Sequence, residues 1–424
     1  MLLISAIFGS CHPDIPQNPV IIDPIDTIET NQYVELLWKK PILDDTIDVG
    51  SKMPIVYQSK AGLIHEFGGS NRLLTFRESN LGEILWTWQN PNYFGEDFTN
   101  KAPQIFGDYM LLSGWNNMTV INLSTGIEVW TFNTKELGNY CGGVYHTLIG
   151  DQIYLSVHEC NSKRTQRKLF RSSIINRNWE LIYQHDRNDG YEGNFMPSAF
   201  YNNSVGDSLL IFQDRMINFS TQDSRVDLIA FNLNSRIIEW KVEDIDPEGS
   251  SNVRAPTVYQ SKVFFMGQRT IHCVTADSGK FVWERQYPKE SDGSYAKHFS
   301  GDMNLPVFNN MLISHPDNQL MEALNPNSGI PIWIQSEDSH QVNKVAGDPY
   351  EMILYKDYII YSSQSQGGVC FHKLFNGELR YRLRSPSIKK SSGHDFNKPI
   401  AIDQELGLLY ACDGWFWYCY KLKI

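Results

Sequence analysis

The stretch STGIEVWTF, residues 124–132, recurs with small changes along the chain and decides the fold. Close copies are LGEILWTW (81–88), DSGKFVWER (277–285) and NSGIPIWIQ (327–335). Each copy places a tryptophan four residues after a glycine. A phrase that recurs in this way indicates a repeated structural unit rather than a single site.

Aligning the chain on this tryptophan gives a column of eight aromatic positions. The members are Trp38, Trp86, Trp130, Tyr183, Trp240, Trp283, Trp333 and Tyr381. Such spacing, with short apolar strands between the aromatics, predicts an all-β fold of four-stranded β-propeller blades. Glycine, asparagine and proline interrupt every candidate helix, which argues against helical repeats of similar length. We expect each aromatic ring to pack between one blade and the next.

The two ends of the chain complement each other. The last unit, residues 397–422, has three candidate strands and no tryptophan strand, whereas YVELLWKK (33–40) is a tryptophan strand without the other three. We therefore expect the N-terminal strand to complete the last of eight blades and close the ring, which removes exposed sheet edges. The third and fourth units are the least regular, and we expect their inserts, NSKRTQRK (161–168) and QDRMINFSTQDSR (213–225), to form longer loops.

Composition and cysteine spacing exclude several classes of function. The chain has 424 residues, 42% of them apolar and 13% aromatic, a globular composition that favours β-structure. The net charge of -11, without a long basic run, argues against a nucleic-acid partner.

The cysteines give no sign of a zinc site, because the sequence contains no Cys-x-x-Cys pair. Cys273, Cys370 and Cys419 fall in a column of small residues in the third strands and are expected to be packing residues. Cys141 and Cys160 could pair in an oxidising compartment, and the sequence leaves this open.

The N-terminus reads as an export signal. Residues 2–8 are apolar and lead through Gly9 and Ser10 to Cys11, a run too short to span a membrane. Small residues directly before a cysteine resemble the lipobox of bacterial lipoproteins, which implies a lipid anchor at Cys11. The alternative is a secretory or disordered N-terminus with an incidental cysteine. We divide the chain into a signal segment (1–11), an extended proline-containing tether (12–32) and the propeller (33–424).

A family resemblance follows from the repeat itself. INLSTGIEVWTF, ALNPNSGIPIW and VTADSGKFVW resemble the tryptophan-docking repeat of the quinoprotein, or PQQ-like, propellers over about residues 33–424. With the lipobox-like start, the eight blades resemble the family of the outer-membrane assembly factor BamB. That resemblance implies a non-catalytic, monomeric scaffold that docks envelope or outer-membrane proteins. The residues after Cys11 lack an acidic run resembling surface-export signals, which favours an outer-membrane lipoprotein that faces the periplasm.

The same resemblance carries an enzymatic alternative. Related dehydrogenases bind pyrroloquinoline quinone (PQQ) and calcium in the central funnel and often carry an adjacent cysteine pair, which this chain lacks. No nucleophile elbow, His-Glu-x-x-His or Walker-type loop is present. We therefore expect no enzyme activity, no catalytic residues, no cofactor and no metal. A quinoprotein oxidoreductase and a glycan- or ligand-binding surface lipoprotein remain the alternatives.

A loop motif precedes the first strand of several units and supplies the candidate binding residues. It combines an acidic residue or amide with an aromatic or apolar residue and often a proline. The members are Asp97 and Phe98, Asp302 and Asn304, Asp395, Phe396 and Asn397, and, in a looser copy, Asn194 and Phe195. These residues either grip a peptide or small ligand at the channel mouth, or satisfy loop backbone groups while the aromatic packs on the blade. Lys297, His298 and His394 depart from the repeat and are therefore candidates for specificity.

Overall fold

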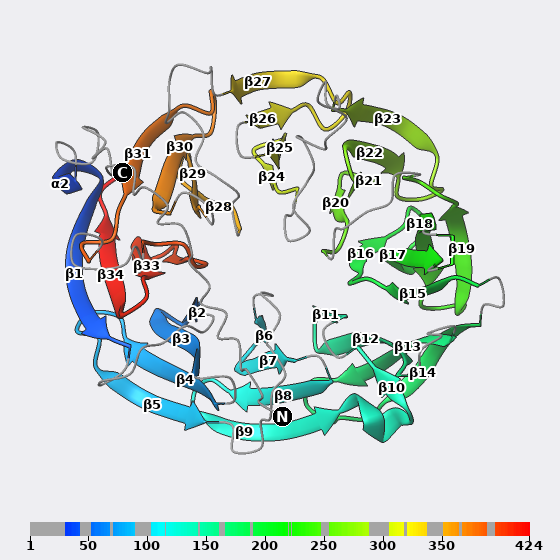
Figure 1. Cartoon of the computed structure of the whole chain (residues 1–424), viewed down its shortest axis with the longest axis horizontal. Helices are drawn as coiled ribbons and strands as arrows, with labels where there is room; N and C mark the ends of the chain where they lie inside the picture. Colours follow the sequence, from blue (N-terminus) through cyan, green and yellow to red (C-terminus); the bar gives the residue numbers. More distant parts are fainter. Residues whose placement is uncertain are drawn as a thin grey trace, which may run out of the picture.

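The computed structural model describes residues 30–42, 52–67, 71–89, 103–114, 116–142, 145–160, 166–186, 190–218, 220–221, 223–246, 254–287, 305–317, 320–336, 351–363, 367–387 and 395–424. Within these residues eight antiparallel sheets stand side by side in a closed ring (Figure 1). The predicted all-β, eight-bladed propeller is confirmed.

Blades 1 and 2 each contain four strands that follow one another from the inner to the outer side of the ring. Blade 1 consists of β2 (Lys52–Tyr57), β3 (Lys60–Phe67), β4 (Asn71–Glu78) and β5 (Ile84–Gln89). Blade 2 consists of β6 (Gln104–Phe106), β7 (Tyr109–Ser113), β8 (Asn117–Asn122) and β9 (Ile127–Asn133).

In blades 3 and 4 the innermost strand is divided into two pieces. Blade 3 follows the 3-10 helix η1 (Thr134–Leu137) and contains β10 (Tyr140–Cys141), β11 (His146–Ile149), β12 (Gln152–Glu159), β13 (Gln166–Ser173) and β14 (Glu180–Asp186). Blade 4 contains β15 (Glu192–Phe195), β16 (Ala199–Asn202), β17 (Ser208–Asn218), β18 (Asp223–Asn232) and β19 (Ile237–Val242).

Blades 5 to 7 return to the simple four-stranded form. Blade 5 is β20 (Thr257–Tyr259), β21 (Lys262–Met266), β22 (Thr270–Thr275) and β23 (Phe281–Gln286). Blade 6 is β24 (Val307–Phe308), β25 (Met311–Asp317), β26 (Leu320–Leu324) and β27 (Pro331–Ser336). Blade 7 is β28 (Ile353–Tyr355), β29 (Tyr358–Ser362), β30 (Val369–Lys373) and β31 (Leu379–Leu383).

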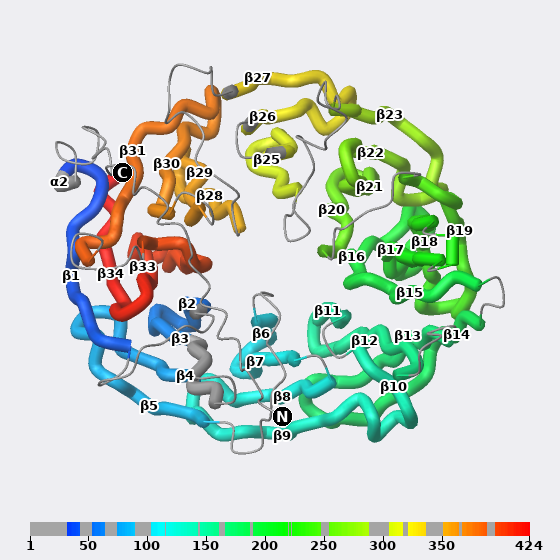
Figure 2. The backbone as a smooth tube through the Cα atoms, in the orientation of Figure 1, coloured from blue at the N-terminus to red at the C-terminus, as the bar shows by residue number. Residues whose placement is uncertain are grey.

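Blade 8 is assembled from both ends of the described chain. Its strands are β32 (Ala401–Asp403), β33 (Leu408–Cys412), β34 (Phe416–Leu422) and, outermost, β1 (Val34–Pro41), which follows the short helix α2 (Thr30–Tyr33). The antiparallel ladder between β1 and β34 runs from Val34 opposite Leu422 to Pro41 opposite Phe416. Figure 2 shows β1, in blue, lying along β34, in red. The predicted closure of the ring by an N-terminal strand is confirmed.

One expected loop is a pair of strands instead. Residues 213–225 belong mostly to β17 and β18, which are 11 and 10 residues long and pair continuously from Leu209–Asn232 to Asn218–Asp223. The prediction of a long loop was wrong because the polar residues of this insert are not solvated. Asp214 and Asp227 are fully buried and ion-paired, as described below, so the hairpin extends blade 4 as ordered sheet.

The repeated tryptophans connect six of the blades to the next blade through one type of hydrogen bond. The indole Nε1–H donates to a main-chain carbonyl in the following blade, over 2.7 to 3.1 Å. The pairs are Trp38–Ser79, Trp86–Leu123, Trp130–Ile174, Trp240–Ala276, Trp283–Pro326 and Trp333–Leu374. A buried indole needs such a partner, which the turn of the neighbouring blade supplies.

The glycine of the repeat is required for two reasons. Gly329 has φ +69°, in the left-handed region, and a Cβ added there would lie 2.6 Å from Cε3 of Trp283 in the preceding blade. The ring of one blade thus covers the glycine of the next. The one turn whose preceding blade carries Tyr183 instead of tryptophan has Arg236, at φ +60°, in the glycine position. Blade 3, whose turn receives Trp130 of the preceding blade, also has an arginine, Arg177 at φ +46°, as its left-handed residue.

This packing gives the first testable expectation. Gly329→Ala should lower the free energy of unfolding by about 1–2 kcal/mol for the left-handed backbone plus about 1–3 kcal/mol for overpacking against Trp283. Gly150→Ala is the matched control, because Gly150 has φ +58° but no atom within 4 Å of the added Cβ. Urea unfolding should show the larger loss at Gly329, partly recovered by adding Trp283→Tyr. Equal losses for both alanine variants would contradict this account.

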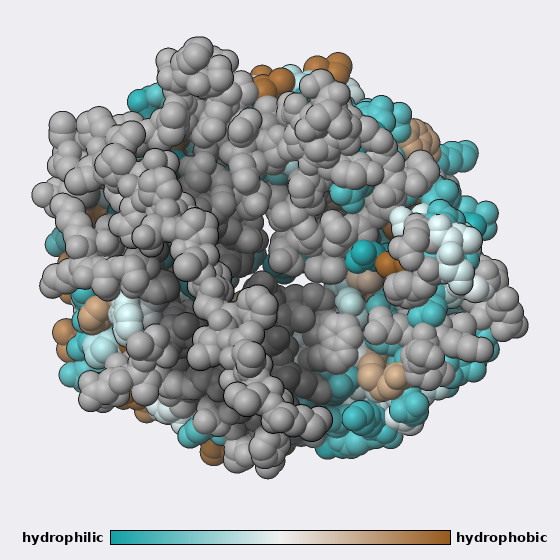
Figure 3. Space-filling view, in the orientation of Figure 1, coloured by the Kyte–Doolittle hydropathy of each residue, from teal (hydrophilic) through white to brown (hydrophobic). Residues whose placement is uncertain are grey.

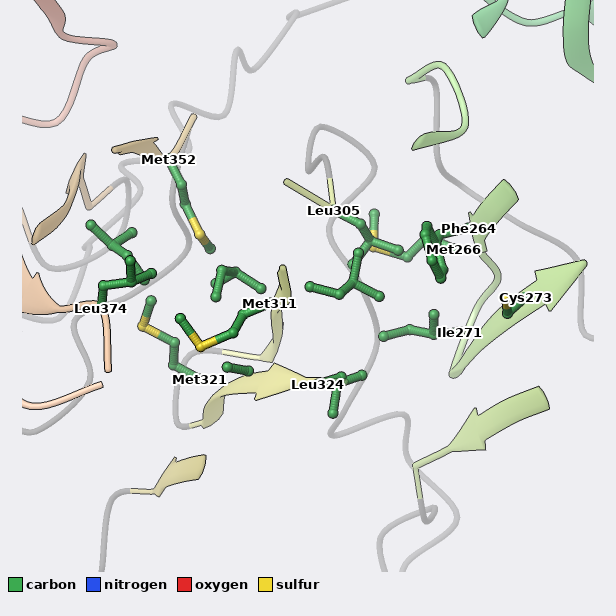
Figure 4. Close-up of a cluster of buried hydrophobic side chains, with 14 of the residues drawn as sticks. Phe264, Met266, Ile271, Cys273, Leu305, Met311, Met321, Leu324, Met352 and Leu374 are labelled. Carbon is green, nitrogen blue, oxygen red and sulfur yellow. The ribbon is translucent and has the colours of Figure 1, made fainter. Parts of the chain in front are cut away.

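The hydrophobic core is divided among the blade–blade contacts. Figure 4 shows one cluster, in which Met311, Met321 and Leu324 of blade 6 lie between Ile271 of blade 5 and Leu374 of blade 7. Because each cluster joins neighbouring blades, the ring as a whole is the unit that buries the core.

The predicted column of small residues opposite the aromatic ring holds only in part. Cys273 lies opposite Trp283 and Cys419 opposite Trp38, as expected. Cys370 lies opposite Arg382, whereas Phe371 is the residue opposite Tyr381, so the alignment of Cys370 was wrong by one residue. In blade 1 the residue opposite the tryptophan is large, because Phe76 occupies that position and stacks on Trp86 with ring centroids 4.6 Å apart.

Candidate docking face

The two faces of the ring carry different connections. In an antiparallel sheet successive connections alternate between the two ends of the strands. One end of each blade carries the hairpin between the first and second strands and the hairpin between the third and fourth strands. We name this end the turn face. The other end carries the hairpins between second and third strands and the links between blades, and we name it the loop face. The predicted loop motifs belong to the loop face.

Part of the predicted site lies outside the described residues. This applies to Cys11, Asp97, Phe98, Lys297, His298, Asp302, Asn304 and His394. The structure does describe Asn194 and Phe195 in blade 4, and Asp395, Phe396 and Asn397 before blade 8. These two groups belong to blades four apart in the eight-bladed ring and are not brought together.

The copy of the motif before blade 8 is buried and held by hydrogen bonds. Asp395 is 5% exposed, and its Oδ1 accepts from the main-chain N–H groups of Ser385 and Phe396, while Oδ2 accepts from Arg384. Phe396 is fully buried and lies edge-on against Tyr418, with centroids 5.2 Å apart. A partner could not reach the Phe396 ring without local opening.

The looser copy in blade 4 behaves in the same way. Phe195 is fully buried, with its ring 5.1 Å from that of Phe212 and 5.6 Å from that of Tyr183. Asn194 is 9% exposed, and its Oδ1 has no hydrogen-bond partner in the described part of the chain. In both copies the aromatic residue packs into the blades, and the Asp395 carboxylate holds loop backbone, so the gripping role is not visible at these positions.

Blades 3 and 4 extend further toward the loop face than their neighbours and are joined there by a buried ion pair. Arg167 on β13 donates Nη1–H to Oδ1 of Asp214 on β17 over 2.6 Å, and both side chains are fully buried. The Arg167 guanidinium also lies 5.5 Å from the centroid of the Phe195 ring. His185 Nδ1 lies 3.6 Å from Oδ2 of Asp214. Charges buried this deeply require close partners, so the two extensions form one rigid wall.

A second buried carboxylate supports the blade 4 extension. Burial favours a raised pKa for Asp227, but hydrogen bonds from Lys241, the Asp244 N–H and Arg225 outweigh it and lower the pKa below its ordinary value. The carboxylate is therefore charged and fully enclosed at neutral pH. Asp227 lies opposite Asp214 in the ladder between β17 and β18. The polar insert thus uses paired charges as structural elements.

A disulfide joins the additional inner strand of blade 3 to the loop-face end of β12. Cys141 and Cys160 are bonded, with Cα atoms 5.2 Å apart and a sequence separation of 19. The main-chain N–H of Cys160 also donates to the carbonyl of Asn139. The pairing that the sequence left open is therefore present, and it requires an oxidising compartment in ordinary cells.

We expect this bond to contribute measurably to stability. Reduction should lower the free energy of unfolding by about 3 kcal/mol, the value for a closed loop of roughly this length. Thermal unfolding with and without reductant measures it. The double variant Cys141→Ser/Cys160→Ser should have the stability of the reduced protein both with and without reductant. Two alkylatable thiols at these positions in the oxidised native protein would contradict the assignment.

Two buried histidines make stability depend on pH. Burial lowers the pKa of His372 and of His272 to about 4. His372 is held by the carbonyl of Gly377 at Nδ1, over 2.9 Å, and by the Tyr361 hydroxyl at Nε2, over 3.1 Å. Both imidazoles are therefore neutral in the folded chain over most of the pH range.

The sign of the pH effect follows from these shifts. An unfolded histidine titrates near 6.5, so between pH 6.5 and 4 the unfolded chain binds more protons and stability falls as the pH is lowered. The loss should be about 2 kcal/mol per histidine from pH 7.5 to pH 5. Urea unfolding of His372→Gln should show a pH-dependent loss smaller by that amount. If the free energy of unfolding of His372→Gln depended on pH as that of the parent chain does, the lowered pKa of His372 would be contradicted.

The described side chains offer few reactive groups. Burial raises the pKa of Cys273 and Cys419 to about 12 and that of Cys370 to about 11, so these thiols are not nucleophiles at neutral pH. No group of three or more His, Cys, Asp or Glu side chains in the described residues could hold a metal ion. The described residues therefore do not fit a calcium site of converging carboxylates, and we assign no step to calcium or PQQ. No helix in the described ranges is long and apolar enough to cross a bilayer.

Comparison with known proteins supports the resemblance inferred from the repeat. The model of the family "outer membrane protein assembly factor BamB" matches residues 215–414, from within blade 4 to within blade 8. No curated protein sequence matches the chain.

Solved structures share the ring at low identity. BamB from Moraxella catarrhalis is 12% identical, with a TM-score of 0.54 over 92% of this chain and 99% of that one. A europium-containing methanol dehydrogenase is 8% identical, with a TM-score of 0.62 over 93% and 94% of the two chains. Quinohemoprotein alcohol dehydrogenase from Comamonas testosteroni is 10% identical, with a TM-score of 0.61 over 94% and 78%. These likenesses show the fold alone. The chain is an eight-bladed β-propeller whose residues 215–414 are similar to the outer membrane protein assembly factor BamB family.

Proposed function

We propose that the protein is a non-catalytic docking scaffold of the bacterial cell envelope that binds partner proteins through its loop face. The observation that carries the proposal is the extension of blades 3 and 4. The other blades have a single innermost strand in the described residues, whereas each of these two adds a second inner strand at the loop-face end. The Arg167–Asp214 pair and the Cys141–Cys160 disulfide hold this additional sheet. A rigid, asymmetric wall on a symmetric ring provides a specific surface for a partner.

The envelope location is part of the same proposal. The similarity of residues 215–414 to the BamB family supports it, as does the disulfide, which requires an oxidising compartment. Lipidation of Cys11 and an extended tether would hold the propeller at the outer membrane, facing the periplasm. Growth with a labelled fatty acid tests the anchor. Label should enter the wild-type chain and not Cys11→Ala, and label in neither would remove the anchor from the account.

A quinoprotein oxidoreductase is the competing function, because both dehydrogenases share the ring. Titrating the purified protein with PQQ and calcium, and following absorbance, separates the two. The scaffold account predicts no saturable binding and no dye reduction with primary alcohols. One equivalent of bound PQQ with alcohol-dependent dye reduction would replace the scaffold by the enzyme. Glycan-array binding in the absence of a protein partner would favour the surface-lipoprotein alternative instead.

A further inference from the structure

The outer edge of the turn face carries a regular series of exposed apolar side chains. Each of blades 1 to 7 has at least one large apolar residue within two positions of the left-handed residue of its third hairpin, with 44% to 66% of its surface exposed. The residues, which we name the apolar rim, are Ile84, Ile127, Ile175, Ile237, Phe281, Ile330 and Phe375. Figure 3 shows apolar residues, in brown, at several places along the outer edge of the ring.

The outermost strands change in character along their length. The rim residues lie near the start of these strands, before the aromatic column. The positions directly after the column are Lys39, Thr87, Thr131, Gln184, Lys241, Glu284, Ile334 and Arg382, and only Ile334 among them is apolar. The exposed apolar surface is therefore concentrated at one end of the outer strands. Such a band around one edge of a soluble ring indicates a surface that meets an apolar medium or partner.

The position at which the chain enters β1 bears on whether the apolar rim meets a membrane or a protein. Helix α2 enters β1 at Val34, opposite Leu422, and that end of the strand belongs to the turn face. The tether that precedes it therefore leaves the ring at the apolar rim. From Cys11 to Thr30 the chain is 19 residues long, which spans at most about 65 Å when extended. A lipid at Cys11 would thus attach to the ring from the turn face and bring the apolar rim within reach of the bilayer.

We propose that the apolar rim rests on the phospholipid surface to which the chain is anchored and so directs the loop face away from the membrane. Half-exposed isoleucine and phenylalanine side chains enter the boundary between headgroups and acyl chains, where apolar residues of peripheral proteins are stabilised. The orientation of the ring that we propose rests on the proposed lipid anchor at Cys11. It deepens the proposed function, because it leaves blades 3 and 4 open to partner proteins.

The test uses the full chain carrying Cys11→Ala, which cannot be lipidated, and flotation with vesicles of phosphatidylethanolamine and a minor share of phosphatidylglycerol. We expect weak binding to the vesicles. The rim variant Ile127→Ser/Ile237→Ser/Ile330→Ser should lower the partition coefficient by at least about tenfold. The control is Ile105→Ser/Phe106→Ser/Phe200→Ser, which removes three side chains that are 37% to 38% exposed on the inner strands β6 and β16. It should bind like the parent chain.

Several outcomes would overturn the proposal. These are a parent chain that does not bind vesicles, a rim variant that binds like the parent, and a control that loses as much binding as the rim variant. A rim variant that changes from dimer to monomer in sedimentation without lipid would assign the rim to a second copy of the chain. Circular dichroism checks folding, and Ile84→Ser/Phe281→Ser/Phe375→Ser is the second rim variant if the first is unfolded. Failure of the anchor is detected separately by the fatty-acid label, and failure of the scaffold by the cross-links described below.

Discussion

A chain that begins at Ile42, and so lacks α2 and β1, is expected to lose the closed ring and to aggregate. Without β1, strand β34 becomes an open edge, and the blade 8–blade 1 core loses Trp38, which is 7% exposed and 5.4 Å from the ring of Trp417. Removing one buried tryptophan side chain alone costs about 3–5 kcal/mol. The ladder of β1 and the burial of Val34 add to that loss. The sum approaches the whole stability of an ordinary domain, about 5–15 kcal/mol.

Size-exclusion chromatography and thermal unfolding measure this effect. The matched control is a chain that begins at Thr30, which keeps α2 and β1 and should unfold at nearly the same temperature as the full chain. Adding a peptide of residues 30–42 to the shorter chain should restore part of the cooperative transition, because the strand completes blade 8 from outside. A monomeric shorter chain with an unchanged melting temperature would show that closure by β1 is not needed.

The second large effect concerns the wall between blades 3 and 4. Arg167→Met should lower the free energy of unfolding by about 3–5 kcal/mol, because it leaves the buried Asp214 carboxylate without its arginine. The double variant Arg167→Met/Asp214→Leu should be much more stable than the single one, since it removes the buried charge as well. Urea unfolding of the single and double variants gives the coupling energy between the two side chains.

A control for this prediction lies on the same strand. Arg171 pairs with Glu180 over 2.5 Å, but their side chains are 35% and 41% exposed. Solvent screens such a pair, so Arg171→Met should leave the unfolding midpoint almost unchanged. Equal effects at Arg167 and Arg171 would mean that burial does not determine the contribution of the ion pair. An Arg167→Met chain as stable as the parent would show that the two extensions do not depend on it.

The architecture could be predicted because its signals are local. Gly126 and Trp130 lie four residues apart, and each pair of this kind recurs in the next unit, so a single chain displays the period and the blade count. The missing strand of the last unit likewise predicted closure. The contact between the Trp283 ring and Gly329 explains why these two residue types recur together.

The candidate site could be predicted only in part, because its contacts join distant positions. Arg167 and Asp214 are 47 residues apart, and the sequence gives no sign that they meet. The polar insert 213–225 therefore resembled a solvated loop. For Phe195 and Phe396 the sequence left open whether the ring grips a ligand or packs on the blade, and both rings are fully buried. The apolar rim could have been found, since the isoleucine of GIEVW and GIPIW stands beside the turn glycine where a solvated turn needs no apolar residue.

The central claim is that partners bind the loop face of the ring. Photo-cross-linking residues placed in living cells at Thr221 or Asp223, exposed positions of the blade 4 hairpin, test it most directly. Ser124 and Ser328, exposed on the turn face, are the matched controls. The account predicts that both hairpin positions capture the same envelope protein, identified by mass spectrometry, while the controls do not. Protein adducts at Ser124 and Ser328, with none at Thr221 and Asp223, would contradict it.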